Sequence, residues 1–476
     1  MAIFDIRSYG AVGDGTTNDA DAIQAAIEAC HTAGGGTVLV PAGARFRTGS
    51  IELRSRVELH VERGAVLAGS DDPGDYTARL EVGALSAGVV DAENDSALML
   101  ITARDCTDIA ITGAGSIDGA GRFFISEDLG HIYRCPNQRP FTVFLIGCQR
   151  VTMRDIRLQD AALWCVRLSG CEDVLIHGIR IDTDLKYPNT DGIDLDRCRR
   201  VRISDCEISS GDDAISLKTT EEFDGYGQTE DVVITNCTLQ STSSAVVVGV
   251  DAVEDIRNVV VSNCVIRSSH RGLAINLGQQ GNFSNILFTD CIVETRHFAR
   301  GWWGHAEPIY VKVGAWHDVV GRLRNVRFRN ILARSENGVY IAADAPGLIE
   351  GVILDGVRIE LDRWSSWPGG EYDRRPTSTG PEVYAHLTAG IHLDTVTDIT
   401  VRNCEVVWAA HPDEFGPAVE AIDVEGLVIE GLRGGSAHPD TLEAVFVRNR
   451  SQGEDRYPVE VPASAPRLTL RASTPE

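Results

Sequence analysis

The sequence is poor in lysine, because Lys186, Lys218 and Lys312 are the only three among 44 basic residues. It also lacks any apolar run close to the roughly 20 residues that a membrane-spanning helix requires. The stretch from Met1 to Arg7 has no charged segment followed by an apolar one, so we expect no signal peptide. These absences favour a cytoplasmic protein without a membrane partner.

The twelve cysteines follow neither a zinc nor a disulfide pattern. No C-x-x-C pair occurs, which argues against a structural zinc site, and we expect no metal and no cofactor. Four cysteines occupy one equivalent position in successive repeats, namely Cys206, Cys237, Cys264 and Cys291. Such a column indicates small buried residues, so free thiols in a reducing compartment are the simplest interpretation.

Positive charge is also scarce, and the formal net charge is −25. An acidic surface repels phosphate backbones, so nucleic acid is not an expected partner. The charge gives no help in attracting long polyanions either, although a local basic cleft would override it.

One phrase recurs along the chain, with two short apolar-polar alternations on either side of a polar turn. Its first apolar residue returns at intervals of 23, 27, 31, 27 and 27 residues, at Val151, Val174, Val201, Val232, Val259 and Ile286. The turn residues are those that tolerate left-handed backbone: Asp205, Asn236, Asn263, Asp290, Asn330, Asp355 and Asn403. The leucine-rich consensus and the hairpin signals of propellers are absent. The repeat therefore predicts an all-β, single-stranded, right-handed parallel β-helix.

A β-helix grows by adding rungs, so residues 1–476 are expected to form one domain. The segment 17–32 places Ile23, Ala26, Ile27 and Cys30 on one face, which predicts an amphipathic helix that caps the N-terminal end. Two long intervals predict loop insertions at 297–322 and 360–390. The tail 455–476 is rich in Pro, Ala and Ser and is expected to be loosely packed.

Three aspartates are candidates for chemistry. Asp191 and Asp212 are 21 residues apart, close to one repeat, and Asp213 follows directly. On a β-helix this spacing stacks the carboxylates on adjacent rungs, where their mutual repulsion favours a retained proton. A protonated acid beside ionised bases suits glycoside hydrolysis. Rung corners without chemistry, or a calcium site, remain alternatives.

The segment from Trp164 to Lys218 resembles the polygalacturonase family, glycoside hydrolase family 28. The resemblance lies in Ala-Leu-Trp-Cys-Val-Arg-Leu from Ala162, Asn-Thr-Asp-Gly-Ile-Asp from Asn189 and Gly-Asp-Asp-Ala-Ile-Ser-Leu-Lys from Gly211. The opening Tyr-Gly-Ala-Val-Gly-Asp-Gly from Tyr9 is similar to that of many pectin-degrading β-helix proteins.

The resemblance implies an inverting hydrolase. Asp212 would be the general acid, and Asp191 and Asp213 would hold and deprotonate the attacking water. Asn189, Asp194 and Lys218 match the family motifs and would contact substrate.

The chain departs from the family pattern after Lys218. Aligned on Cys237, the expected Gly-His-Gly falls on Thr242-Ser243-Ser244, so its histidine is replaced by Ser243, whereas an alignment on Gly249 replaces it by Ser244. The expected Arg-x-Lys, which binds uronate carboxylates in the family, aligns with Ala274 and Asn276. Loss of both cations argues against plain polygalacturonate around the scissile bond.

Other residues could take over substrate binding. The candidates, beside Ser243 and Asn276, are His270, Arg271, Trp302, Trp303, His305, Glu307, Lys312 and Trp367. The alternatives are an exposed corner pair for His270 and Arg271, a solvated Lys312 and simple loop packing for the tryptophans. Aromatic side chains in two insertions favour a carbohydrate platform.

The leading hypothesis is an inverting glycoside hydrolase that acts on oligosaccharides. An exo-acting enzyme on pectin-derived fragments of the rhamnogalacturonan type, or on neutral glycan fragments, fits the altered residues. A β-helix polysaccharide lyase or transglycosylase is the first alternative, and a non-catalytic glycan-binding β-helix is the second.

Overall fold

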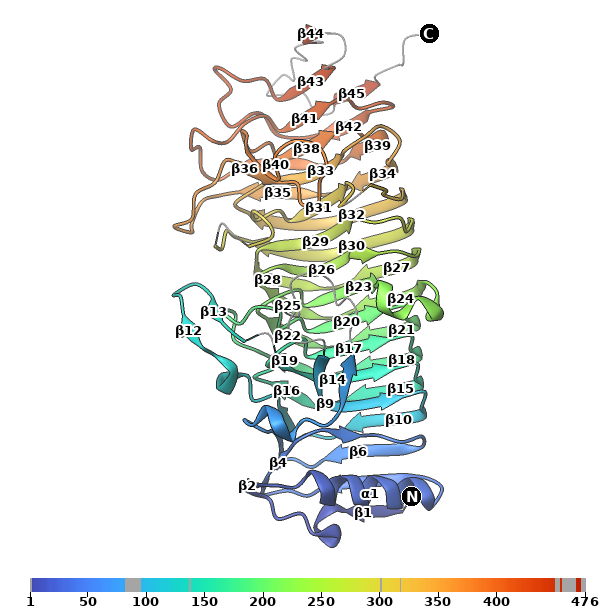
Figure 1. Ribbon diagram of the computed structural model, residues 1–476. Coiled ribbons are helices and arrows are strands. Elements are labelled where there is room, and N and C mark those ends of the chain that lie inside the picture. Colours follow the sequence, from blue (N-terminus) through green and yellow to red (C-terminus); the bar gives the residue numbers. More distant parts are fainter. Residues whose placement is uncertain are drawn as a thin grey trace. The chain divides into compact units, whose positions relative to one another are not determined.

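The structure is a computed structural model of the 476-residue chain, and it describes residues 2–81, 96–136, 138–299, 302–316, 318–449, 454–455 and 468–471. It divides into an N-terminal unit, Met1–Thr238, and a C-terminal unit, Leu239–Glu476. In each unit, parallel strands are stacked in rows and joined by short turns (Figure 1). The predicted all-β, right-handed parallel β-helix is confirmed. That the chain forms a single domain stays a prediction.

The strands of the N-terminal unit form three rows of parallel neighbours. The first row is β1 (Ile3–Asp5), β3 (Gly36–Val40), β6 (Val57–Val61), β10 (Thr107–Thr112), β15 (Gln149–Arg154), β18 (Glu172–His177), β21 (Arg199–Ser204) and β24 (Thr229–Thr235). The second is β2 (Asp14–Asn18), β4 (Arg45–Thr48), β7 (Val66–Gly69), β11 (Ser116–Asp118), β16 (Arg157–Gln159), β19 (Arg180–Asp182) and β22 (Glu207–Ser210). The third is β5 (Ile51–Glu52), β9 (Ser96–Arg104), β14 (Pro140–Ile146), β17 (Val166–Ser169), β20 (Ile193–Asp196) and β23 (Ile215–Thr219).

The first and second rows are the two strands predicted for each repeat. In β18 and β21 the buried residues alternate with exposed ones, as in a strand with one face on the core. The turn between the rows is left-handed at the predicted position, with φ of +58° at Asp205 and +56° at Asn236. At the copy that contains Asp355 the left-handed residue is instead Gly356, with φ of +68°, because glycine adopts this conformation without strain.

The third row carries the sequence motifs and was not predicted as strands. All four residues of β17 and of β20 are buried, and so are all five of β23. A strand that is covered on both faces has no alternation of apolar and polar residues. The repeat analysis therefore missed it.

A helix covers the first strands, as expected. Helix α1 (Ala20–Thr32) buries the four predicted residues Ile23, Ala26, Ile27 and Cys30, and it contacts β1 and β3. It begins three residues later than predicted because Asp14–Asn18 form strand β2. Short 3₁₀ turns are η1 (Ile6–Tyr9), η2 (Pro73–Asp75), η3 (Gly121–Phe124) and η4 (Glu221–Tyr226). Strand β8 (Arg79–Glu81) lies antiparallel to β9, and β12 (Glu127–Asp128) pairs with β13 (Tyr133–Arg134).

The C-terminal unit repeats the three rows. The first is β27 (Ile256–Ser262), β30 (Phe283–Thr295), β32 (Leu323–Ser335), β34 (Ile349–Asp355), β39 (Thr397–Arg402) and β42 (Val428–Leu432). The second is β28 (Val265–Ser269), the later halves of β30 and β32, β35 (Arg358–Leu361) and β40 (Glu405–Trp408). The third is β26 (Ser244–Ala252), β29 (Arg271–Leu277), β31 (Ile309–Val313), β33 (Val339–Ala343), β38 (Ile391–Asp394), β41 (Val419–Ile422) and β43 (Val445–Asn449). Strand β25 (Thr238–Ser241) spans the division between the units.

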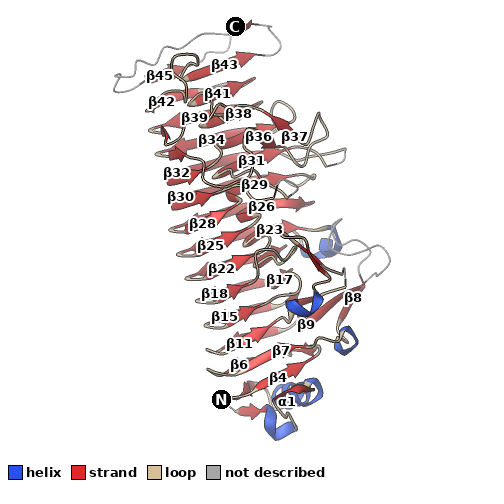
Figure 2. Cartoon of the chain, turned by 90° about the vertical axis from the view of Figure 1, so that its left-hand side faces the viewer, coloured by secondary structure: helices blue, strands red, loops and turns tan. Residues whose placement is uncertain are grey.

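Both predicted insertions contain regular structure. Strand β31 lies in the middle of 297–322 and belongs to the third row. The insertion 360–390 holds an antiparallel hairpin of β36 (Glu371–Asp373) and β37 (Val383–Ala385). Figure 2 shows this hairpin beside the third row of the C-terminal unit.

Part of the tail 455–476 lies outside the described residues. Its described part includes β45 (Leu468–Arg471), which pairs antiparallel with β42, and the end of β44 (Glu454–Asp455), which pairs with β43. All twelve cysteines are free thiols, as predicted. Among the described residues, no helix has the length and apolar character needed to cross a bilayer.

Candidate active site

The register of the third row brings the aspartate motifs together. Strands β20 and β23 are parallel neighbours, with Asp194 paired to Ser216 and Asp196 to Lys218. One step before this ladder, the Gly192 N–H donates to the Asp213 carbonyl at 2.8 Å. Asp191 and Asp213 therefore stand on adjacent rungs, as their spacing predicted.

Three carboxylates converge at this point. One oxygen from each of Asp191, Asp212 and Asp213 lies within 4.8 Å of the others. Asp191 is 3% exposed and its Oδ1 is buried without a hydrogen-bond partner among the described residues. The backbone N–H of Asp213 donates to Asp212 Oδ1 at 2.9 Å. Isolated rung corners do not explain this convergence, whereas acid–base catalysis and binding of a hard cation both need it.

Burial and mutual repulsion keep protons on the cluster. Burial raises the pKa of Asp191 well above its ordinary value, and the negative charge of Asp212 adds to the effect. Burial, followed by the charge of Asp213, raises the pKa of Asp212 to about 7. Carboxyl groups this close titrate as a set rather than one by one. Near neutral pH, the set therefore holds both protonated and ionised oxygens.

Asp194 is an accessory member of the cluster. Burial raises its pKa to about 7 although the Lys218 cation and a hydrogen bond from the Ser216 hydroxyl favour ionisation. Its Oδ2 is buried without a partner among the described residues. Burying such an oxygen is costly unless a ligand or a water meets it.

Lys218 is positioned by an aromatic wall. It is 5% exposed, and its Nζ lies 5.2 Å from the centroid of the Trp164 ring. The Trp164 ring is held edge-on against Phe141, with centroids 5.8 Å apart. The Lys218 charge lowers the pKa of all three raised aspartates, Asp191, Asp194 and Asp212, and so limits how far burial protonates them.

Asn189 is held by a residue that the sequence did not single out. Arg139 Nη2 donates to Asn189 Oδ1 at 3.2 Å, and Nη1 donates to the carbonyls of Ala162 and Pro188 at 2.9 Å. Arg139 is buried, and burial lowers its pKa while the Asp191 charge opposes that shift. It precedes β14 in no recognisable motif, so sequence offered no signal for it.

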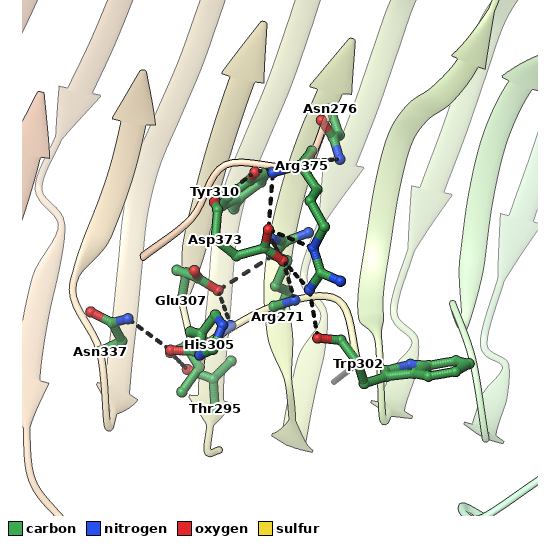
Figure 3. Close-up of polar contacts among 12 residues, drawn as sticks. Arg271, Asn276, Thr295, Trp302, His305, Glu307, Tyr310, Asn337, Asp373 and Arg375 are labelled. Carbon is green, nitrogen blue, oxygen red and sulfur yellow. Dashed lines mark hydrogen bonds and ion pairs between the residues drawn. The ribbon is translucent and has the colours of Figure 1, made fainter. Parts of the chain in front are cut away.

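Most of the other candidate residues gather in the C-terminal unit, around Arg271 (Figure 3). Its Nη2 donates to Asp373 at 2.9 Å and its Nε lies 3.4 Å from Glu307. The guanidinium also stacks on Tyr310, 3.6 Å from the ring centroid. We call Arg271, Glu307, Asp373 and Arg375 the Arg271 cluster.

The insertion hairpin supplies half of the Arg271 cluster. Arg375 donates from Nη2 to Asp373 at 2.9 Å and to the Trp302 carbonyl at 2.8 Å. Burial alone would raise the pKa of Asp373, but the charges of Arg271 and Arg375 hold it well below its ordinary range. The two cations and two carboxylates of the cluster neutralise each other.

His270 and Arg271 do not form an exposed corner pair. They are 1% and 2% exposed. Burial lowers the pKa of His270 well below its ordinary value, and the neighbouring His305 and His297 lower it further. His305 is 2% exposed, and its backbone N–H donates to Glu307 Oε2 at 2.8 Å.

Lys312 is not a solvated lysine. It is fully buried, and its Nζ donates to Asp344 at 2.6 Å. Burial lowers the pKa of Lys312 to about 8, although the Asp344 carboxylate opposes the shift. The ion pair occupies the ammonium group, so Lys312 does not replace the missing lysine of the family motif as a free cation.

The three positions that depart from the family pattern are packed within the C-terminal unit. Ala274 is fully buried in an apolar cluster with Tyr310. Asn276 Nδ2 donates to the Arg375 carbonyl at 3.2 Å. The Ser243 carbonyl accepts from the Arg271 N–H at 2.8 Å.

The predicted tryptophans have separate partners. Trp303 lies edge-on to Trp316, with centroids 5.8 Å apart, and the Arg375 guanidinium is 5.3 Å from its ring. The Trp367 carbonyl accepts from Arg363 at 2.5 Å. Loop packing therefore accounts for part of their placement.

The surroundings of the Arg271 cluster contain several buried polar atoms without a hydrogen-bond partner among the described residues. They are Asn276 Oδ1, His270 Nδ1, Trp302 Nε1, His305 Nε2 and Glu307 Oε1. Native proteins rarely leave such groups unpaired.

The sequence model of "Glycosyl hydrolases family 28" matches residues 30–366. A probable polygalacturonase of Vitis vinifera is 34% identical over 248 residues, 50% of this chain and 49% of that protein. The exo-poly-alpha-D-galacturonosidase of Dickeya chrysanthemi is 27% identical over 45% of this chain and 42% of its own length. The matches with these curated relatives thus span half of their length or less.

Two solved structures share the fold. The exopolygalacturonase of Thermotoga maritima aligns with a TM-score of 0.62 at 20% identity, over 99% of this chain and 95% of that one. The family 28 exopolygalacturonase of Yersinia enterocolitica aligns with a TM-score of 0.66 at 17% identity, over 89% and 78% of the two chains. With the family match over most of the sequence, the chain belongs to glycosyl hydrolases family 28.

Proposed function

We propose that this chain is a glycoside hydrolase that cleaves pectin-derived oligosaccharides with Asp191, Asp212 and Asp213. The convergence of the three carboxylates within 4.8 Å carries the proposal. Family membership and the polygalacturonase relatives support the reaction class.

In the proposed reaction, the protonated carboxyl of Asp212 gives its proton to the glycosidic oxygen as the bond to the anomeric carbon breaks. A water held by Asp191 and Asp213 adds to that carbon and gives up a proton to one of them. The pKa of about 7 at Asp212 supports the acid role, because a substantial share of the group then still holds its proton at neutral pH. The division of roles follows the family resemblance.

The proposed stereochemical outcome is inversion. The resemblance supports inversion, but inverting enzymes usually separate their carboxyl groups by about 6.5–9.5 Å. The nearest oxygens of the trio lie within 4.8 Å of one another, which bounds single oxygen atoms and not the separation of the carboxyl groups. Inversion is therefore proposed from the family resemblance, and a retained anomer of the first product would overturn it.

The substrate is proposed to be less charged than polygalacturonate. The cations of the C-terminal unit that could replace the family's Arg-x-Lys, Arg271 and Lys312, are buried against Asp373 and Asp344. No free cation among these residues is therefore left for a uronate carboxylate. Pectic side-chain or rhamnogalacturonan-type fragments, and neutral glycans, meet this requirement.

Exo action is part of the proposal. Two solved structures with the same fold and one curated relative are exo-acting galacturonide hydrolases by name. In this chain, the 360–390 hairpin is bonded to the third row through Asp373, Arg375 and Tyr310, and it covers part of that row.

A panel of pectic and neutral oligosaccharides tests the proposal, with the anomer of the first product followed by NMR. Release of end sugars from a weakly charged substrate is expected. A product that absorbs in the ultraviolet as an unsaturated uronate would establish the lyase alternative. Binding without cleavage on every glycan would support the glycan-binding module and overturn the enzyme.

A further inference from the structure

A second convergent cluster lies in the C-terminal unit and has no part in the proposed reaction. It consists of His386, His392 and Glu420, whose nearest nitrogen and oxygen atoms all lie within 4.8 Å of one another. His392 on β38 and Glu420 on β41 are direct partners in the parallel ladder. His386 follows β37 of the insertion hairpin.

The hydrogen bond of His386 fixes which ring nitrogen faces the cluster. Its Nδ1 lies 2.7 Å from the Leu387 carbonyl, an acceptor, so Nδ1 carries the hydrogen. In the neutral ring Nε2 then presents a lone pair, and it lies 3.5 Å from Glu420 Oε2. A cation between the neutral ring nitrogen and the carboxylate oxygen would satisfy both acceptors. Metal-binding histidines typically have this arrangement, with the second nitrogen donating to a carbonyl.

His392 presents a second nitrogen to the same oxygen. Its Nδ1 is 2.6 Å from Glu420 Oε2, and its Nε2 is buried without a partner among the described residues. The ring is stacked on Tyr340 at 5.2 Å between centroids and packs on Tyr372 at 4.7 Å. These aromatic contacts fix the plane of the His392 ring, so its Nδ1 is positioned before any ligand arrives.

We propose that His386 Nε2, His392 Nδ1 and a Glu420 oxygen bind a divalent transition-metal cation of the zinc class. Two imidazoles and one carboxylate are a common zinc ligand set, with bonds of about 2.0–2.2 Å, which place tetrahedral ligand atoms about 3.4 Å apart. The 3.5 Å between His386 and Glu420 fits this spacing. The 2.6 Å contact of His392 opens when the metal replaces its hydrogen. The 26% exposed side chain of His386 provides the entry path.

The metal would tie the insertion to the β-helix. The backbone N–H of His386 donates to the Gly370 carbonyl, at the start of the same hairpin, at 2.9 Å. That hairpin also carries Asp373, which neutralises Arg271. A cation bound by one hairpin residue and two third-row residues would hold the hairpin on the rungs. The proposal does not depend on the hydrolase activity.

The test titrates the chelator-treated full chain with Zn²⁺ and, separately, with Ca²⁺, by calorimetry and thermal unfolding. We expect one equivalent of Zn²⁺ to bind and to raise the melting temperature. The His386→Gln variant should bind Zn²⁺ at least about tenfold more weakly and should lose the thermal shift. His386 is partly exposed, so its replacement should leave the fold intact.

Two control variants assign the binding. His177→Gln alters a histidine that is 48% exposed and lies in the N-terminal unit, and it should bind Zn²⁺ as the wild type does. Asp212→Asn alters the aspartate trio of the N-terminal unit, and this variant should also bind one equivalent of Zn²⁺. Absence of Zn²⁺ binding, unchanged affinity in His386→Gln, or loss of the equivalent in Asp212→Asn would each overturn the proposal.

Discussion

The Arg271 guanidinium donates to the Asp373 carboxylate at 2.9 Å, although the two residues are 102 positions apart in the sequence. Arg271 begins a third-row strand, and Asp373 ends the first strand of the inserted hairpin. Both side chains are at most 2% exposed. The insertion thus supplies a second buried carboxylate, beside Glu307, to a cation of the β-helix.

Replacing Asp373 by asparagine should destabilise the fold. The change leaves Arg271 and Arg375 with one carboxylate partner fewer in a buried environment, and breaking a buried pair typically costs about 3–5 kcal/mol. The free energy of unfolding, measured by urea denaturation, should fall by this amount. The intrinsic fluorescence of the nearby tryptophans provides a signal.

The matched control is Asp362→Asn. Asp362 pairs with Arg334 at 2.8 Å, but the two side chains are 24% and 48% exposed. Exposed pairs contribute about 0–1 kcal/mol, so this variant should unfold almost as the wild type does. Equal losses in the two variants would show that the buried position of Asp373 carries no special weight.

Asp212→Asn should abolish most of the activity while the chain stays folded. An amide cannot give a proton to the leaving oxygen, and loss of general acid catalysis typically lowers kcat by about 10²–10⁴-fold. Initial rates on the best substrate of the panel measure the loss. Asp205→Asn, at a half-exposed turn of the first row, should keep wild-type rates. Wild-type kcat in Asp212→Asn would place the reaction elsewhere.

The pH dependence of kcat/KM should show a limb set by the aspartate trio. Burial and the Asp213 charge raise the pKa of Asp212 to about 7, so the acid loses its proton, and activity falls, as the pH rises through about 7. Asp213→Asn removes the neighbouring negative charge and should shift the remaining limb to lower pH. A limb that does not move would assign it to another group.

The fold could be predicted because its signal is local and repeated. Alternation around Asp205 and Asn236 specifies two strands and a left-handed turn in each copy, and stacking copies specifies a solenoid. The strands of the third row were not predicted, because β20 and β23 are buried throughout and show no alternation. Periodicity reports a strand only when one face meets solvent.

The site could be predicted only where its parts follow the repeat. Asp191 and Asp212 are separated by nearly one rung, so sequence spacing converts directly into proximity. Lys312 was interpreted as either a solvated residue or a site residue. Its partner Asp344 lies on a later rung, so the sequence around Lys312 did not reveal the ion pair. Arg139 and Asp373 lie outside the repeat, so the repeat spacing does not predict their contacts.

Asp212→Asn should also stabilise the protein at alkaline pH. The folded pKa of Asp212 is about 7 against an ordinary 3.8, so the folded chain binds the proton more tightly than the unfolded chain does. The contribution of this proton to stability is therefore fully present below about 3.8 and is lost as the pH rises to about 7. Asparagine resembles the neutral acid and pays no such cost. The melting temperature of the variant should exceed that of the wild type by a larger margin at about pH 8 than at about pH 4. An equal difference at both pH values would mean that Asp212 titrates normally in the folded chain.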